Sequence, residues 1–288
     1  MIQLTNATKR FGDKTAVDHF SMKLEPGTIT GFIGPNGAGK TTTLRMLTGV
    51  LEPDEGSVEI NGYDMKEHPI EAKKQFGFIS DNPDLFTPLK GVEYVNFICD
   101  IYQVPEEVRA QRLDGLLDEF EMRDAIGDKL GTYSHGMRQK VHIIATLMHD
   151  PDLWIMDEPM TGLDPQSSYI LKRKMRQHAE KGNTVLFSTH VLEVAEKLCD
   201  HIVIIAKGRE AYNGTLEALK AQYPDTSLEE IFLEVTGSRV HEQEEMGAFA
   251  SGRDAAAVEA MEVDSVWSDA ADEADPNAFG ASDVSEGE

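Results

Sequence analysis

The residues with the clearest chemical potential form a glycine-rich run that ends in a lysine and a threonine. Glycines let successive backbone N–H groups turn inward, where they can bind anionic oxygens. A lysine can then neutralise phosphate charge, and a threonine hydroxyl is a suitable ligand for Mg²⁺. We therefore expect a site for the phosphates of a nucleotide. The run fits the pattern G-x-x-x-x-G-K-[ST] and consists of Gly34, Pro35, Asn36, Gly37, Ala38, Gly39, Lys40 and Thr41.

A predicted strand precedes this run and a predicted helix follows it, which is the context of a phosphate-binding loop. Residues 28–33 are a short apolar run that predicts a buried strand, and residues 40–47 predict a helix that leaves the loop. Such a helix directs its positive N-terminal end at the same point as the N–H groups of the loop. An ordinary glycine-rich turn between a strand and a helix is the alternative. The lysine and threonine favour phosphate binding.

A second set of chemical groups ends another predicted strand. Residues 153–156 are continuously apolar, as in a parallel strand that is covered on both faces, and Asp157 and Glu158 follow directly. This is the end of a strand at which α/β sheets bind ligands. We expect Asp157 to hold the magnesium shell and Glu158 to orient or deprotonate an attacking water. A strand that ends in a solvated turn is the alternative.

Two more polar groups follow predicted strands and are candidates for the same site. Residues 184–189 predict a buried strand that ends at His190, a side chain able to hydrogen-bond a terminal phosphate or to orient a glutamate. Residues 75–79 predict another strand, and a polar loop containing Asp81 follows it. Taken alone, His190 fits a structural histidine better than a catalytic one.

Phe11 and Val17 place an aromatic and an aliphatic side chain shortly before the phosphate loop. An aromatic ring can stack on adenine. A single aromatic residue is more often part of a hydrophobic core, so both roles stay open for Phe11. Residues 2–5 and 20–24 alternate in polarity as antiparallel strands do.

The start of another predicted helix is a further candidate phosphate contact. Ser134 is a natural N-cap, and Gly136 leaves the backbone exposed at the helix N-terminus. An ordinary capped helix explains the same pattern. Before it, residues 91–126 have the periodicity of amphipathic helices and predict an inserted helical region.

Strands that alternate with helices predict an α/β fold over residues 1–236, followed by an acidic tail at residues 237–288. The tail holds 14 acidic residues and two arginines, so it carries half of the net charge of −24. Because it has little apolar surface, we expect it to be disordered. The tail either keeps the protein soluble or contains a regulatory or docking segment around residues 263–267. No basic patch is evident, which argues against nucleic-acid binding.

The two cysteines and the lengths of the apolar runs indicate the cellular compartment of the protein. Cys99 and Cys199 lack metal or redox spacing, so we expect buried thiols in a reducing compartment. No apolar run approaches the roughly 18 residues that cross a bilayer, and the N-terminus has no signal-peptide pattern. We therefore expect a protein that is soluble alone and reaches a membrane only through a partner.

Five motifs, in this order, resemble the ATP-binding subunit of an ABC transporter, and the resemblance covers residues 1–236. It implies a P-loop NTPase fold of ABC type, with an N-terminal antiparallel β subdomain. It also implies an inserted helical subdomain at about residues 85–150, which meets a membrane partner. The motifs are the phosphate loop, residues 133–139, Asp157 with Glu158, residues 161–164, and His190.

The resemblance also implies roles for single residues. The family forms head-to-tail dimers, either of one chain or with a second ATP-binding subunit, that enclose two ATP molecules. Ser134 and Gly136 would contact the nucleotide of the other subunit. Within one subunit, phosphate and magnesium binding would fall to Lys40, Thr41 and Thr42. Glu158 would be the catalytic base, and His190 would bind the γ-phosphate.

Two positions depart from the commonest family pattern. Tyr133 and His135 stand where leucine and glycine are usual, and this variant resembles the subunits of multidrug, antibiotic or ABC-2-type exporters. Asp81 stands at the loop position that usually carries a glutamine contacting magnesium.

The function implied is ATP hydrolysis that powers a separate transmembrane permease, in an exporter, from the cytoplasmic face of the cell membrane. The alternative is a soluble ABC ATPase that acts as a conformational clamp on a ribosome or DNA complex. The chain has neither a second cassette nor long coiled-coil insertions, which such proteins carry. A cassette that binds ATP without hydrolysing it is disfavoured, because Lys40, Glu158 and His190 are all present.

Overall fold

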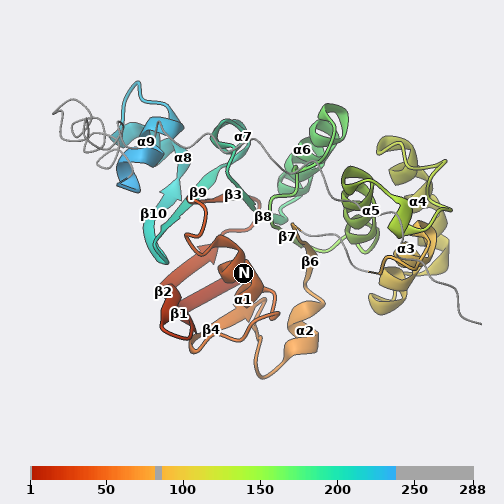
Figure 1. Cartoon of the computed structure of the whole chain (residues 1–288), viewed down its shortest axis with the longest axis horizontal. Helices are drawn as coiled ribbons and strands as arrows, with labels where there is room; N and C mark the ends of the chain where they lie inside the picture. The colour runs from red at the N-terminus through yellow and green to blue at the C-terminus, as the bar shows by residue number, and fades with distance from the viewer. Residues whose placement is uncertain (1, 82–85, 238–288) are drawn as a thin grey trace, which may run out of the picture. The chain divides into compact units, whose positions relative to one another are not determined.

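The computed structural model describes residues 2–81 and 86–237, which form two β-sheets and the helices around them (Figure 1). Beyond Gly237, the predicted acidic tail lies outside the described residues, and its role stays a prediction. None of the helices in the described ranges is long and apolar enough to span a membrane. Cys99 and Cys199 are both buried free thiols, as expected.

The first sheet is antiparallel and has the strand order β2-β1-β4-β5. Its strands are β1 (Ile2–Phe11), β2 (Lys14–Leu24), β4 (Glu55–Ile60) and β5 (Tyr63–Asp64). The sequence prediction made β1 and β2 too short. Register shifts interrupt their pairing at several points, so the alternation of polar and apolar residues is lost before the strands end.

The second sheet has the order β10-β9-β3-β8-β7-β6, in which β10 pairs antiparallel with β9 and every other pair is parallel. All residues of β3, β7 and β8 are buried, which confirms the interpretation of their continuous apolar runs. The strands of this sheet are β3 (Ile29–Ile33), β6 (Phe76–Ile79), β7 (Leu153–Met156), β8 (Thr184–Thr189), β9 (His201–Ala206) and β10 (Arg209–Thr215).

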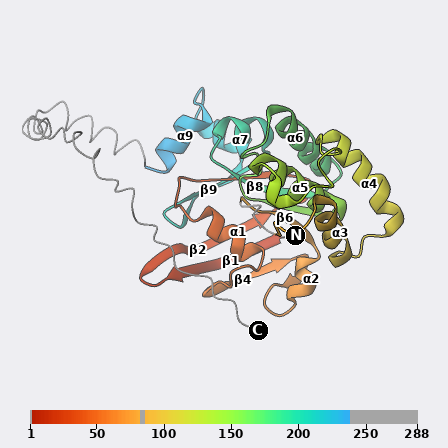
Figure 2. The same ribbon diagram turned by 45° about the vertical axis from the view of Figure 1, so that its right-hand side comes forward.

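The parallel sheet separates two hydrophobic clusters. Phe32, Ile155 and Leu186 pack with the antiparallel sheet and with α1 (Lys40–Leu47). Their chain neighbours Ile33 and Met156 point to the other face, where most of the remaining helices cover the sheet. Figure 2 shows α1 on the side of β1, β2 and β4, with α6 and α7 on the opposite side. Each central strand is therefore shared by both clusters.

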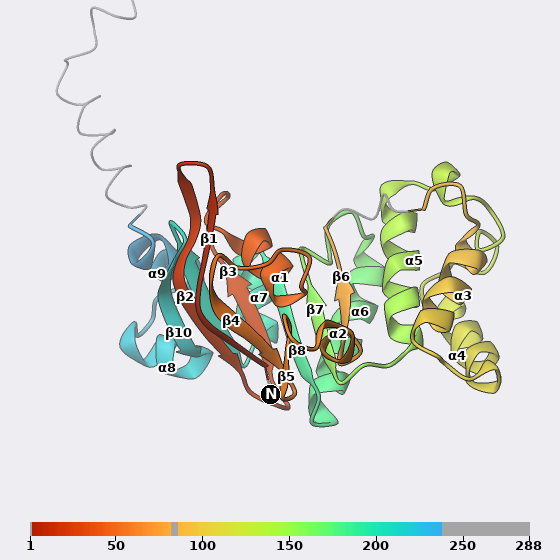
Figure 3. The same cartoon turned by 90° about the horizontal axis from the view of Figure 1, so that it is seen from below.

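The other helices include the predicted inserted region, whose members α3, α4 and α5 gather at one end of the sheet (Figure 3). The helices α2, α7 and α8 were not predicted from the sequence. These helices are α2 (Pro69–Lys73), α3 (Gly91–Ile101), α4 (Glu106–Glu119), α5 (His135–Met148), α6 (Pro165–Glu180), α7 (Leu192–Leu198), α8 (Leu216–Gln222) and α9 (Leu228–Val235), with a 3₁₀ turn at Leu130–Thr132.

Candidate functional site

A cavity of about 580 Å³ opens at the carboxyl ends of the parallel strands and gathers most of the predicted site residues. The sequence analysis missed four residues of its lining: Lys14, Ala16, His135 and Thr161. The predicted residues that line it are Phe11, Asn36, Gly37, Gly39, Lys40, Thr41, Thr42, Asp81, Asp157, Glu158 and His190.

The glycine-rich loop needs its glycines for close backbone approach. Gly37 and Gly39 have positive φ values of 75° and 111°, a region that side chains disfavour. A Cβ at Gly39 would lie 2.6 Å from the carbonyl oxygen of Ala16, and one at Gly34 would collide with the carbonyl oxygen of Ile205. The loop is therefore pressed against β2 and β9, and its shape depends on these contacts.

The side chain of Lys40 folds back and bonds to the backbone of the phosphate loop. Its ammonium group donates hydrogen bonds to the carbonyl oxygens of Gly34, at 2.6 Å, and Pro35, at 3.3 Å. Burial lowers the pKa of Lys40, and the nearby carboxylates of Glu158 and Asp157 oppose that shift. The side chain thus provides a positive charge in a low-dielectric site, where it interacts strongly with anions.

One hydroxyl group links the ends of β7 and β8. Ser188 Oγ donates to Asp157 Oδ1 at 2.6 Å and accepts from the backbone N–H of Glu158 at 2.9 Å. Asp157 is 1% exposed, so its carboxylate is fixed within the wall of the cavity. Sequence reasoning missed Ser188; its place two residues before His190, in a strand predicted to be buried, was the available signal.

Glu158 and His190 contact each other across the same edge. Glu158 Oε2 lies 2.9 Å from His190 Nδ1, and the Glu158 backbone has a positive φ of 46°. A carboxylate only accepts hydrogen bonds, so His190 Nδ1 carries a proton and donates it, which leaves Nε2 to bond to another group. Positive φ is uncommon outside glycine and recurs at functional sites.

The oxygen groups of the cavity fit a magnesium ion. Thr41, Asp81 and Asp157 all line it and offer hydroxyl and carboxylate oxygens, the ligands that Mg²⁺ prefers. Within residues 2–81 and 86–237, no cluster of three or more His, Cys, Asp or Glu side chains can hold a metal. A magnesium ion here would therefore take its remaining ligands from phosphate and water, which is usual for Mg²⁺.

The N-terminus of α5 lies beside the cavity rather than over the phosphate loop. Ser134 caps the helix by accepting from Met137 N at 3.2 Å, which confirms the predicted N-cap. Neither Ser134 nor Gly136 belongs to the lining of the cavity in this chain, whereas His135 does. A Cβ at Gly136 would collide with the carbonyl oxygen of Gly162, and the His135 ring packs against Gly162 itself.

The two candidates for adenine contact differ in the structure. Phe11 is 50% exposed and lines the cavity, so it is free to stack on a base. Val17 is fully buried in the cluster beneath the antiparallel sheet and does not line the cavity, so its contact with a ligand stays a prediction. A Cβ added at Gly39 would lie 3.3 Å from Cγ2 of Val17, so Val17 packs directly beneath the loop and supports it. Ala38 is likewise 3% exposed and supports the loop from below.

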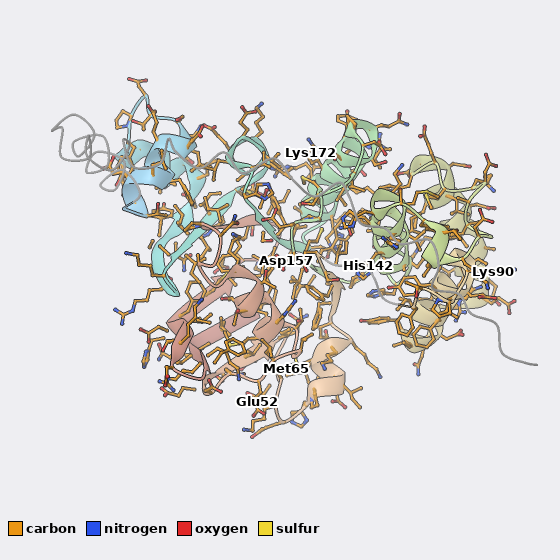
Figure 4. All side chains as sticks on the ribbon, viewed as in Figure 1. Glu52, Met65, Lys90, His142, Asp157 and Lys172 are labelled. Carbon is orange, nitrogen blue, oxygen red and sulfur yellow. The ribbon has the colours of Figure 1, made fainter. Side chains whose placement is uncertain are left out.

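A groove of about 420 Å³ runs between the sheet and the helices α3 and α5. It shares Asp81 and Asp157 with the first cavity and is otherwise largely apolar. Val50 and Phe86 in its lining are 62% and 46% exposed. Figure 4 labels Asp157 and also His142, which belongs to the groove. The two cavities therefore meet at the carboxylates.

Comparisons with known proteins agree in pointing to one family. The family described as "ABC transporter" matches residues 17–161. The chain is 37% identical over 238 residues to the ABC transporter ATP-binding protein NatA of Bacillus subtilis, covering 81% of this chain and 97% of that protein. It is 34% identical over 221 residues to the daunorubicin resistance ATP-binding protein DrrA3 of Streptomyces coeruleorubidus, covering 77% and 70%.

Two solved structures extend the comparison to the fold. A structure described as the ATP-binding subunit of an ABC transporter superposes with a TM-score of 0.79 at 32% identity, covering 82% of this chain and 99% of that one. A dimeric structure of MJ0796, described as a bacterial ABC transporter cassette, gives a TM-score of 0.68 at 25% identity, covering 75% and 99%.

Proposed function

The chain belongs to the ABC transporter family as an ATP-binding and ATP-hydrolysing subunit, and from this premise we propose that it powers export through a separate transmembrane permease. One observation carries the assignment of the site. Asp157, Glu158 and His190 face one cavity from the ends of two neighbouring strands, and Lys40 faces it from the start of α1. The groups that phosphoryl transfer needs are thus in reach of one bound triphosphate.

The proposed roles follow from these positions. Lys40 and the loop N–H groups bind the β- and γ-phosphates, and Thr42 adds a hydroxyl contact. Glu158 accepts a proton from the attacking water, because its carboxylate is oriented by His190 Nδ1 at 2.9 Å. His190 Nε2, once protonated, donates to a γ-phosphate oxygen. Phe11 stacks on the adenine ring.

Magnesium is the proposed metal cofactor, and Thr41, Asp81 and Asp157 would hold it. When bound, it neutralises charge that develops on the phosphates. Removal of divalent cations with excess EDTA should therefore abolish hydrolysis, and added Mg²⁺ should restore it. Hydrolysis that survives EDTA would contradict the metal assignment.

We further propose that two cassettes close head to tail around two ATP molecules. Ser134 and Gly136 lie outside the cavity of their own chain, as expected of groups that serve the nucleotide of a second subunit. The dimeric cassette among the similar structures supports this arrangement. The second subunit is another copy or a related ATP-binding chain.

The groove between the sheet and α3–α5 is the proposed docking site for the permease, which would hold the chain on the inner face of the cell membrane. Exposed apolar side chains such as Val50 and Phe86 suit a partner helix. Export is favoured by the signature with Tyr133 and His135 and by the daunorubicin resistance relative.

The test is to isolate the full-length chain from its native membranes in detergent and to assay ATPase activity in the same sample. We expect a polytopic membrane protein to copurify and to stimulate hydrolysis, and Glu158→Gln to abolish the stimulated rate. Intact ATPase activity without a membrane partner, together with cosedimentation with ribosomes or DNA, would refute the transport assignment and favour the soluble clamp.

A further inference from the structure

A buried histidine links the groove to the strand that leads into the nucleotide cavity. His142 lies on α5 and is 8% exposed. Its Nδ1 lies 3.2 Å from Tyr94 Oη on α3, and its Nε2 lies 3.2 Å from the carbonyl oxygen of Phe78 on β6. One imidazole ring therefore joins three elements that are distant in sequence.

The hydrogen bonds of this ring have a fixed direction. The Phe78 carbonyl oxygen can only accept, so His142 Nε2 must carry a proton and donate it. Burial lowers the pKa of His142, which favours the neutral ring with an unprotonated Nδ1. Tyr94 Oη then donates to Nδ1. The chain of donors runs from Tyr94 through His142 to the backbone of β6.

The acceptor at Phe78 is at an unpaired strand edge. β6 is the last strand of its sheet in the described part of the chain, so its outward carbonyl groups have no neighbouring strand. The next carbonyl, that of Ile79, faces inward and accepts from Asp157 N at 2.8 Å. Asp81 follows β6 after one residue. His142 thus fixes β6, which leads to Asp81 and whose Ile79 carbonyl oxygen holds the backbone of Asp157.

The donor at Tyr94 is at the wall of the groove. Tyr94 is 5% exposed, and its ring lies 5.9 Å from that of Phe86, which is exposed in the groove. A partner that displaces Phe86 or α3 must therefore shift Tyr94 Oη relative to His142. A hydrogen bond depends steeply on donor geometry, so a small shift changes the restraint on β6.

We propose that His142 is a positioning residue that couples occupancy of the groove to the placement of Asp81 and Asp157 through the chain Tyr94–His142–Phe78. The inference rests on the proposed function, because the groove is taken as the permease site. It adds the residues that carry the signal, and coupling of this kind acts in both directions. Nucleotide binding should therefore change the environment of α3, even without the permease.

The first test uses the full chain alone, in a Glu158→Gln background that keeps bound ATP unhydrolysed. Amide hydrogen exchange of residues 76–81 and 91–101 is compared with and without Mg·ATP. We expect ATP to slow exchange at both segments, and Tyr94→Phe to reduce the change at 91–101 by roughly fivefold or more. Tyr94→Phe removes only the buried hydroxyl, so the groove surface is kept.

Tyr102→Phe is the matched control, because Tyr102 also lines the groove but stacks on His149, with ring centroids 3.7 Å apart, instead of bonding to His142. It should leave the response to ATP as in the parent chain. An equal loss in both variants, or an intact response in Tyr94→Phe, overturns the coupling role. Absence of ATP binding in the parent chain instead refutes the proposed function.

The second test measures the ratio of permease-stimulated to unstimulated ATPase activity in the purified complex. Tyr94→Phe and His142→Leu should lower this ratio to a similar extent, and the double variant should lower it no further. His142→Gln should retain part of the ratio, because an amide can donate to Phe78 and accept from Tyr94. Additive losses would mean separate structural defects and refute the chain. A parent complex without stimulation would refute the transport assignment itself.

Discussion

The parallel strands have their carboxyl ends on one side of the sheet and their amino ends on the other, and we call these two sides the carboxyl edge and the amino edge. Each edge holds a fixed aspartate, but the charges around the two aspartates differ. At the carboxyl edge, Asp157 is bound by the Ser188 hydroxyl at 2.6 Å and faces the cavity with Glu158 beside it. At the amino edge, Asp200 accepts from Ile29 N at 2.9 Å and from Arg176 Nη1 at 2.9 and 3.1 Å.

The difference shows how one structural element serves two purposes. The guanidinium group of Arg176 supplies the counter-charge of Asp200 and also donates to the Leu198 carbonyl oxygen at 2.6 Å, so that edge is internally complete. Asp157 is bonded to a hydroxyl group instead, and it shares the nearby ammonium group of Lys40 with a second carboxylate, Glu158, so its edge can bind a further cation. We expect substitutions to affect catalysis at one edge and stability at the other.

The largest effect should come from Glu158→Gln. The amide keeps the size of the side chain but cannot accept a proton, so kcat for ATP hydrolysis should fall by roughly 10²–10⁴-fold. ATP affinity should be retained, which equilibrium binding measures directly. If the variant keeps its turnover, Glu158 is not the catalytic base, and the carboxyl edge would not differ from the amino edge in its role in catalysis.

Ser188→Ala should affect catalysis next. It leaves Asp157 Oδ1 and the Glu158 N–H without their shared hydroxyl, and loss of a partner behind a metal ligand typically costs about 10–100-fold in activity or metal affinity. Steady-state ATPase assays over a range of Mg²⁺ concentrations would measure this. Thr184→Val, at the amino end of the same strand, is the control and should keep normal activity. Equal losses in both variants would argue against a special carboxyl edge.

Arg176→Met should lower stability instead. It removes the counter-charge of Asp200 and the bond to Leu198, and the free energy of unfolding should fall by about 1–3 kcal/mol. Denaturant titration would measure the loss, and the variant should keep its kcat under conditions where it is folded. Arg173→Met on the same helix is the control, since Arg173 makes only a long contact of 3.8 Å with Glu119. A catalytic defect in Arg176→Met would show that the edges are not independent.

Asp164→Ala should have the smallest effect and sharpens the comparison. Asp164 is near the catalytic edge, yet it caps α6 through Ser167 N at 2.8 Å and pairs with Lys140 at 2.7 Å. Loss of an N-cap typically costs about 0.5–2 kcal/mol of stability. Thermal unfolding of both proteins at neutral pH would show the difference.

The contribution of Asp164 should also depend on pH. The Lys140 ammonium and the bonds from Ser167 hold the pKa of Asp164 well below its usual value of 3.8. The folded state therefore favours the charged carboxylate, and its contribution to stability is present above pH 3.8 and is lost as the pH falls through the lowered pKa. Below pH 3.8 the stability of Asp164→Ala should decline less steeply than that of the parent chain. Parallel curves would mean that Asp164 does not act as a charged cap.

Local patterns made much of the fold predictable. The glycine-rich loop, the buried strands before and after it, and the Ser134 cap each depend on residues within a few positions of one another. The short helix α7 lacked such a signal, since seven residues show too little periodicity to be recognised. The five motifs follow one another in the order that the family has, so the resemblance to the family predicted that they form one site.

Long-range packing was not predictable from these patterns. Ser188 meets Asp157 only because β8 pairs with β7, and Val17 is buried beneath the loop only because β2 folds back under Gly39. His142 stands between two apolar residues in the sequence, Val141 and Ile143. Its two partners are remote in sequence, and nothing in one sequence specifies them.

The sharing of each central strand by both hydrophobic clusters bears on how the described chain unfolds. Phe32 belongs to one cluster and Ile33 to the other, and the same alternation holds for Ile155 and Met156. Neither cluster can lose its side of these strands without exposing apolar surface of the other. The antiparallel sheet and the helical layer are therefore expected to melt in one transition, with equal calorimetric and van't Hoff enthalpies. No stable half-folded cassette should be left behind to aggregate or to bind nucleotide unproductively.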